Sequence, residues 1–108
     1  YDATSQLIFR DNLQPMIRDK HVLILTASVT TGISVRKAME CVQYYGGTVA
    51  GACGIFSACP EVDGMKIQSI FGPEDISGYA TYPVHDCPLC KQKAKLEAQV
   101  NGYGYSKL

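Results

Sequence analysis

Residues 21–45 read HVLILTASVTTGISVRKAMECVQYY, and this stretch decides the fold. Its first part, Val22 to Leu25, is a continuous apolar run, which is typical of a strand buried on both faces. From Val35 to Val42 the apolar residues recur at helical spacing, and Gly46-Gly47 provides a helix stop. The sequence therefore predicts a central buried strand, a loop and an amphipathic helix.

The loop, Thr30-Thr31-Gly32-Ile33-Ser34, carries three hydroxyl groups and no carboxylate. The first amides of a helix lack internal partners, and the helix dipole makes this end positive. Gly32 lets the backbone approach a ligand closely, and the hydroxyls can add donors. These features indicate a phosphate cradle, although the same residue types are also typical of an ordinary helix cap. The strand before the loop and the helix after it favour the phosphate.

A second strand is predicted by residues 48–56, which read TVAGACGIF. A strand, a helix and a strand in this order form a parallel, right-handed crossover unit. Ligands of such sheets bind beyond the carboxyl ends of the strands, which is where residues 30–34 fall. Residues 66–71 alternate in polarity and predict a third strand at the sheet margin.

The segments before residue 21 and after residue 71 have weaker secondary-structure patterns. Residues 6–9 predict a short strand, and residues 73–75 resemble the start of a brief helix. Residues 90–100 predict a last helix, which Asn101-Gly102 would end.

Length, charge and cysteine content limit the kinds of protein that this chain can be. The chain has 108 residues and ten charges of each sign, which predicts one domain and no nucleic-acid partner. No apolar run approaches a membrane span, and no signal-peptide pattern is present. The chain does not start with Met, so we expect a processed or truncated piece. Five cysteines, with Cys41 and Cys53 in apolar contexts, favour buried reduced thiols and a cytoplasmic location.

Cys87-Pro88-Leu89-Cys90 has the Cys-x-x-Cys spacing of half a structural zinc site. His85 is a candidate third ligand, whereas Cys53 and Cys59 do not complete a standard pattern. A thioredoxin-type redox pair would directly follow a buried strand, and residues 82–84 make a poor strand. Zinc ligands, a redox pair and ordinary thiols at a helix start all stay open, with the last favoured.

Residues 21–34 resemble the diphosphoribosyl-binding motif of type I phosphoribosyltransferases. In that family a hydrophobic strand is followed by two acidic residues, two further residues and Thr-Thr-Gly. The strand, the spacing and the Thr-Thr-Gly loop match, whereas Thr26 and Ala27 stand in place of the acidic pair. The rest of the chain is most similar to a divergent orotate phosphoribosyltransferase.

This resemblance implies an α/β fold with a parallel-sheet, Rossmann-like core. Residues 1–108 would be a single domain that forms the C-terminal part of a phosphoribosyltransferase-like domain. The implied reaction transfers phosphoribosyl from 5-phosphoribosyl 1-diphosphate to a nucleobase such as orotate, in pyrimidine nucleotide synthesis, with Mg2+ and in a homodimer. Residues 30–34 would hold the 5-phosphate, and Glu61 and Asp63 fall near the base-recognition region.

The absence of the acidic pair lowers the catalytic activity that we expect from this chain. In the family these carboxylates accept hydrogen bonds from the ribose hydroxyls, so Thr26 and Ala27 mark catalytic positions. A hydrogen bond to a charged group contributes roughly 1.5–3 kcal/mol, so losing two lowers binding or rate on the order of a hundredfold to ten-thousandfold. We therefore expect phosphate binding to survive better than catalysis. The alternatives are a non-catalytic module that binds a nucleotide or phosphoribosyl diphosphate, and a zinc-binding structural module.

Overall fold

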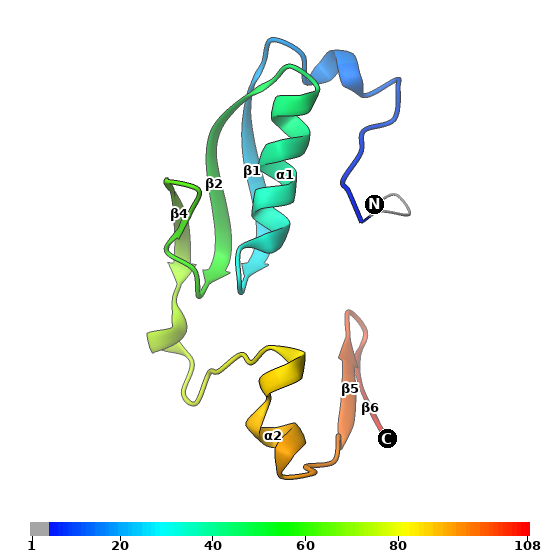
Figure 1. Ribbon diagram of the computed structural model, residues 1–108, viewed down its shortest axis with the longest axis vertical. Coiled ribbons are helices and arrows are strands. Elements are labelled where there is room, and N and C mark those ends of the chain that lie inside the picture. The colour runs from blue at the N-terminus through cyan, green and yellow to red at the C-terminus, as the bar shows by residue number, and fades with distance from the viewer. Residues whose placement is uncertain (1–4) are drawn as a thin grey trace.

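The computed structural model describes residues 5–108 (Figure 1). The strands are β1 (His21–Val29), β2 (Thr48–Ser57), β3 (Glu61–Val62), β4 (Met65–Phe71), β5 (Ala98–Asn101) and β6 (Gly104–Lys107). The α-helices are α1 (Ile33–Tyr44) and α2 (Pro88–Lys91), and the 3-10 turns are η1 (Gln14–Met16), η2 (Pro73–Asp75) and η3 (Val84–Asp86). The strand–helix–strand unit predicted from residues 21–56 is therefore confirmed, as is the brief helical turn at residues 73–75.

A four-stranded sheet with the order β1-β2-β4-β3 organises the first part of the chain. β1 runs parallel to β2, β2 runs parallel to β4, and the two-residue β3 pairs antiparallel with β4. The mostly parallel α/β arrangement is as predicted, but two positions differ. β1 lies at an edge instead of the centre, and β4 lies inside the margin because β3 pairs on its outer side.

Helix α1 covers one face of this sheet (Figure 1). The register places Ile24 beside Ala52 and Ala52 beside Ile67, so these side chains form one row on the same face. Val35 and Met39, which are spaced for one side of a helix, pack on this row. The core is completed by Val29 and Val62.

The opposite face of the sheet is not covered by any described part of the chain. Leu23, Leu25, Ile55 and Ile70 lie on this face and are 52%, 73%, 56% and 73% exposed. The prediction that the first strand is buried on both faces is therefore wrong for this chain. A continuous apolar run is typical of strands with a layer on each side, and here only one layer is present.

Helix α1 ends as the glycine pair predicts. Gly46 has a left-handed φ of 82°, and its amide donates to the Gln43 carbonyl at 3.1 Å. The Gly47 amide donates to the Val42 carbonyl at 2.9 Å. These two bonds form a Schellman motif, which satisfies the last carbonyls of the helix and turns the chain into β2.

The C-terminal prediction is wrong. Helix α2 ends at Lys91, and a β5–β6 hairpin follows where a helix over residues 90–100 was expected. Asn101 pairs with Gly104, and its side-chain oxygen accepts a hydrogen bond from the Tyr103 amide at 2.8 Å. The loop between the strands is therefore the two residues Gly102 and Tyr103, and Gly104 follows it with a φ of 127° that favours glycine. Asn101 ends a strand and does not stop a helix. Residues 6–9, predicted as a strand, also lie outside any strand.

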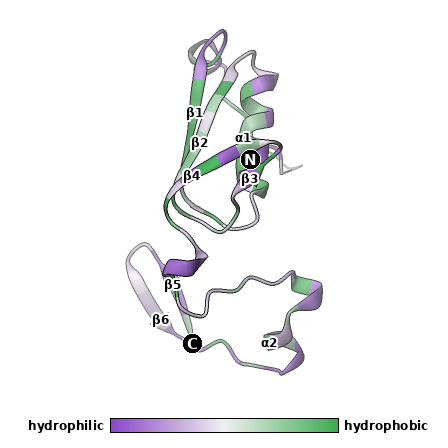
Figure 2. Cartoon of the chain, turned by 90° about the vertical axis from the view of Figure 1, so that its left-hand side faces the viewer, coloured by the Kyte–Doolittle hydropathy of each residue, from purple (hydrophilic) through white to green (hydrophobic). Residues whose placement is uncertain are grey.

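The C-terminal region stands apart from the sheet. The radius of gyration is 16.8 Å, whereas a compact chain of this length has roughly 13 Å. Hydrophobic segments run along β1, β2 and β4, and the β5–β6 hairpin lies away from them (Figure 2). Every residue of the hairpin strands is exposed. None of the helices in residues 5–108 has the length and hydropathy needed to span a bilayer.

Candidate functional site

The loop between β1 and α1 is shaped by Gly32. Gly32 is the N-cap of α1 and has φ 83° and ψ −2°, a left-handed conformation that strains residues with a Cβ. The Arg36 amide donates to the Gly32 carbonyl at 2.9 Å, which closes the first turn of the helix. The chain therefore leaves the sheet and enters the helix within three residues, 30–32.

The first amides of α1 carry no side-chain cap. The N-cap residue is a glycine, and no side-chain capping bond forms there. The predicted phosphate ligands Thr30, Thr31, Ile33 and Ser34 are exposed around it, and a small cavity of about 40 Å³ is lined by residues 28–35. The ordinary-cap alternative, with a Ser or Thr side chain on these amides, is therefore not what the structure shows, and phosphate binding stays a prediction.

Gly32 also packs tightly against the hairpin of β3 and β4. A Cβ at this position would lie 2.6 Å from Val62 Cγ2 and 3.3 Å from Cys59 Sγ. Gly32 was predicted to make room for a ligand, and the structure adds a second reason for a glycine here. On the side where a Cβ would project, the glycine makes room for Val62, which is buried.

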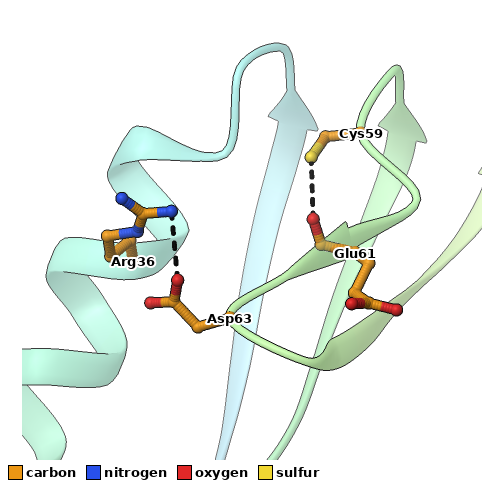
Figure 3. A network of polar contacts seen from close by, with 4 residues as sticks. All are labelled: Arg36, Cys59, Glu61 and Asp63. Atoms are coloured by element: carbon orange, nitrogen blue, oxygen red, sulfur yellow. Dashed lines mark hydrogen bonds and ion pairs between the residues drawn. The ribbon is translucent and has the colours of Figure 1, made fainter.

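One ion pair joins this hairpin to the first turn of α1, beside a hydrogen bond within the segment that leads into the hairpin (Figure 3). Arg36 Nη2 lies 3.0 Å from Asp63 Oδ1. The Cys59 thiol donates to the Glu61 carbonyl at 3.1 Å. The Ser57 hydroxyl donates to the Cys59 carbonyl at 2.7 Å, so the segment from the end of β2 to β3 is fixed beside the loop.

Glu61 and Asp63 were expected near a bound base, and the structure shows what each of them contacts. Asp63 forms an ion pair with Arg36, and the Glu61 side chain is exposed while its carbonyl accepts the Cys59 thiol. Sequence reasoning missed Arg36, Cys59 and Val62 as residues that position the loop. No local spacing could have found Val62, because its contact with Gly32 joins residues thirty positions apart.

Thr26 and Ala27 lie near the carboxyl end of β1, next to the uncovered sheet face. The Thr26 hydroxyl donates to the Ser28 carbonyl at 3.3 Å. Both residues line an open cavity of about 690 Å³ on the sheet, together with Leu25, Ile55 and Ile70. No residue that lines this cavity carries a carboxylate. At the two positions of the family's acidic pair, Thr26 carries a hydroxyl that is already hydrogen-bonded and Ala27 carries only a methyl group.

Cys87 and Cys90 lie at the start of α2, with Cys87 as the N-cap. Hydrogen bonds from the backbone amide and then the thiol of Cys90 lower the pKa of Cys87. The same thiol contact, followed by charge repulsion from Cys87, raises the pKa of Cys90. Within residues 5–108, no group of three or more His, Cys, Asp or Glu side chains converges as a metal site, and His85 does not complete one. The zinc-ligand assignment stays a prediction without a third ligand in this part of the chain.

The remaining cysteines are free thiols. Cys41 is buried in α1, and this burial raises the pKa of its thiol. Cys53 is half-buried on β2. The prediction of a buried thiol is therefore confirmed for Cys41 and wrong for Cys53, whose strand has no layer over its second face.

A comparison with known proteins identifies a relative of this chain. The chain is 40% identical over 75 residues to an orotate phosphoribosyltransferase of Pelotomaculum thermopropionicum. The chain is related to the phosphoribosyltransferases. The match covers 68% of this chain and 37% of the length of that relative, and no protein-family model matches the chain. The phosphoribosyltransferase resemblance and the mostly parallel α/β fold that it implied are thus both confirmed.

Proposed function

We propose that this chain supplies the phosphate-binding part of a phosphoribosyltransferase. The reaction moves phosphoribosyl from 5-phosphoribosyl 1-diphosphate to a nucleobase such as orotate. One observation carries the proposal: Gly32 is the N-cap of α1 and no side-chain capping bond forms there, in a chain related to phosphoribosyltransferases. An anion is the partner that such amides and the positive end of the helix dipole favour.

The 5-phosphate is assigned to the loop of residues 30–34. The backbone amides of Ile33 and Ser34 belong to the first turn of α1, at the positive end of its dipole. The exposed Thr30, Thr31 and Ser34 line the same small cavity as Ile33. The loop contains no carboxylate that would repel a phosphate. Arg36 follows in the first turn, but Asp63 already compensates its charge. Recognition therefore depends on amides and hydroxyls more than on a free cation.

In the proposed reaction, the bond between the anomeric carbon and the diphosphate oxygen breaks, and a bond to a ring nitrogen of the base forms. The chain contributes by holding the phosphoribosyl group in place, which lowers the entropic part of the barrier. Positive charge develops at the anomeric carbon, and a carboxylate beneath the ribose would stabilise it. Thr26 and Ala27 cannot supply that charge, so we expect a slow reaction from this chain.

The resemblance also implies Mg2+ with the diphosphate. Mg2+ is usually held by one or two carboxylates together with substrate phosphates. The cavity beside Thr26 and Ala27 has no carboxylate among its lining residues. The residues that line this cavity therefore do not fit a directly bound Mg2+. An ion that accompanies the substrate there would be coordinated by the diphosphate oxygens and water.

A second function is favoured by the same substitution of the acidic pair. A module that binds phosphoribosyl diphosphate or a nucleotide without reacting needs the loop of residues 30–34 but not carboxylates at positions 26 and 27. Both functions share the phosphate loop, and they differ in whether pyrophosphate is released.

Calorimetry and a pyrophosphate-release assay test these proposals on the full chain. We expect heat on addition of 5-phosphoribosyl 1-diphosphate, weakened by Thr31→Val. Thr48→Val is the matched control, because Thr48 is exposed at the opposite end of β2. Pyrophosphate release with orotate supports the transferase, and binding without release supports the non-catalytic module. Absence of binding with and without Mg2+ would refute both.

We extend the proposal to the assembly. Residues 1–108 form the C-terminal part of a phosphoribosyltransferase-like domain, and the protein works as a homodimer in the cytoplasm. The support is the uncovered face that carries Leu23, Leu25, Ile55 and Ile70, since a contiguous exposed apolar patch marks a contact surface. The free thiols support the reducing compartment.

A further inference from the structure

The pair Cys87 and Cys90 has a defined local structure that the proposed function does not use. Cys87 precedes α2 with φ −99° and ψ 116°, so its side chain lies at the start of the helical turn. The Lys91 amide donates to the Cys87 carbonyl at 3.0 Å, and the Gln92 amide donates to the Pro88 carbonyl at 3.0 Å. These bonds fix the turn that brings the two cysteines onto one side.

The two cysteines flank a single helical turn, with Cys87 as its N-cap and Cys90 inside it. Hydrogen bonding from Cys90 lowers the pKa of the Cys87 thiol. Residues three apart on a helical turn have β carbons about 5–6 Å apart, and a disulfide requires about 3.5–4.5 Å. Cys87 has extended backbone angles outside the helix, so helical geometry does not hold it at this spacing.

The surroundings disfavour a metal and leave the thiols accessible. No third ligand converges on the pair within residues 5–108, and the neighbouring Asp86 carboxylate is engaged by Lys91. Cys90 is exposed and Cys87 is half-buried, in a region that does not pack on the sheet. A dissolved reagent can therefore reach the sulfur atoms without unfolding the core.

We infer that Cys87 and Cys90 form a redox-active dithiol, which a small-molecule disulfide oxidises to an intramolecular disulfide. The Cys87 thiolate attacks one sulfur of the reagent, whose S–S bond breaks and releases a first thiolate. The Cys90 thiolate then attacks the Cys87 sulfur of the mixed disulfide and expels the second thiolate. The protons lost by the two cysteines end on the two released thiols. The protein is oxidised by two electrons, and the reagent is reduced by the same two.

The order of attack follows from the unequal acidity of the two thiols. Hydrogen bonding from Cys90 lowers the pKa of Cys87, whereas the pKa of Cys90 is raised, so Cys87 is the attacking residue and Cys90 resolves the intermediate. The other three cysteines cannot substitute for this pair. Cys41 and Cys53 belong to the helix and sheet of the first region, and the Cys59 thiol already donates to Glu61.

Glutathione disulfide is the probe for this inference. The full chain is incubated with it, free thiols are then alkylated, and the peptides are mapped by mass spectrometry. We expect one peptide that contains Cys87 and Cys90 to lose two hydrogens and to carry no glutathione. In Cys90→Ser, glutathione should remain attached to Cys87. In the control Cys59→Ser, the Cys87–Cys90 link should form as in the parent chain.

Three results would overturn the inference. The first is that Cys87 and Cys90 both stay alkylatable at the rate seen without the probe. The second is that each retains its own glutathione, which would show that the thiols cannot reach each other. The third is that oxidation occurs only after a chelator has removed bound zinc, which would make the pair a metal site.

Discussion

The Cβ position of Gly32 lies 2.6 Å from the Cγ2 atom of Val62. This contact ties the loop of residues 30–34 to a hairpin that begins some thirty residues later. The loop therefore depends on tertiary packing for its shape, and on a residue without a side chain at the point of contact. Changes in this hairpin should affect ligand binding even though the hairpin carries none of the predicted phosphate ligands.

Gly32→Ala should lower the free energy of unfolding by two effects. A left-handed residue with a Cβ costs roughly 1–2 kcal/mol, and overpacking against Val62 adds about 1–3 kcal/mol. Gly64→Ala is the matched control, because Gly64 has φ 80° and open space around its Cβ position. Urea denaturation should show the larger loss for Gly32→Ala, and equal losses would contradict the packing argument.

Val62→Ala should cost less stability in the Gly32→Ala background than in the parent chain. This substitution removes the methyl groups that the new Cβ meets, but it leaves the backbone strain. A double-mutant cycle measured by urea denaturation isolates this coupling. Strictly additive effects of the two substitutions would show that the contact with Val62 is not the source of the overpacking.

The Arg36–Asp63 ion pair should contribute little to stability. The side chains are 57% and 48% exposed, and such pairs contribute about 0.2–1 kcal/mol. A cycle of Arg36→Gln and Asp63→Asn should give a coupling energy in this range that decreases as salt is added, because salt screens exposed charges. A coupling that is indifferent to salt would mean that the pair is held by more than charge.

Restoring two carboxylates should separate the proposed functions. Thr26→Asp with Ala27→Asp should raise pyrophosphate release on the order of a hundredfold or more if the loop already positions the substrate. The measurement is release at saturating phosphoribosyl diphosphate and orotate, with binding checked by calorimetry. Unchanged release in a variant that still binds the ligand would favour the non-catalytic module.

The uncovered sheet face should drive self-association. Leu25 is 73% exposed, so Leu25→Lys should cost little in folding while it places a charge in the apolar patch. Light scattering should show a smaller particle for this variant. Val100→Lys, on the equally exposed hairpin strand β5, is the control and should leave the particle unchanged. A reduction in both variants, or in neither, would argue against contact through the sheet face.

The buried thiol of Cys41 should make stability depend on alkaline pH. Burial raises the pKa of Cys41 in the folded chain, so the folded state holds this proton more strongly than the unfolded state. The free energy of unfolding should stay constant below the ordinary thiol value of about 8.5 and fall as the pH rises above it. Cys41→Ala should show a shallower fall in urea denaturation, and an identical pH profile would contradict this origin.

The strand–helix–strand unit could be predicted because its signals are local. Val22 to Leu25, the helical spacing from Val35 and the stop at Gly46-Gly47 each act through neighbouring residues. The place of the loop at the carboxyl end of β1 followed from the same order of elements. The sequence could not reveal the uncovered face, since an apolar run shows what a strand can bury and not what is present to cover it.

The features that were missed depend on distant contacts or on ambiguous signals. The packing of Val62 on Gly32 has no trace in the spacing of either residue. Asn101-Gly102 is compatible with both a helix stop and a hairpin turn, and the weak alternation of residues 98–101 did not decide between them. At Cys87 and Cys90 the spacing identified the pair, but only the structure showed that no third ligand converges on it.

The central claim is that an anion binds the uncapped amides at the start of α1. The most direct test is an NMR titration of the full chain with ribose 5-phosphate, which follows the backbone amide signals residue by residue. The account predicts saturable shifts concentrated at Ile33, Ser34 and Val35, reproduced more weakly by inorganic phosphate and absent with ribose. Amide signals of these three residues that stay unchanged at saturating phosphate, or shifts confined to other parts of the chain, would contradict it.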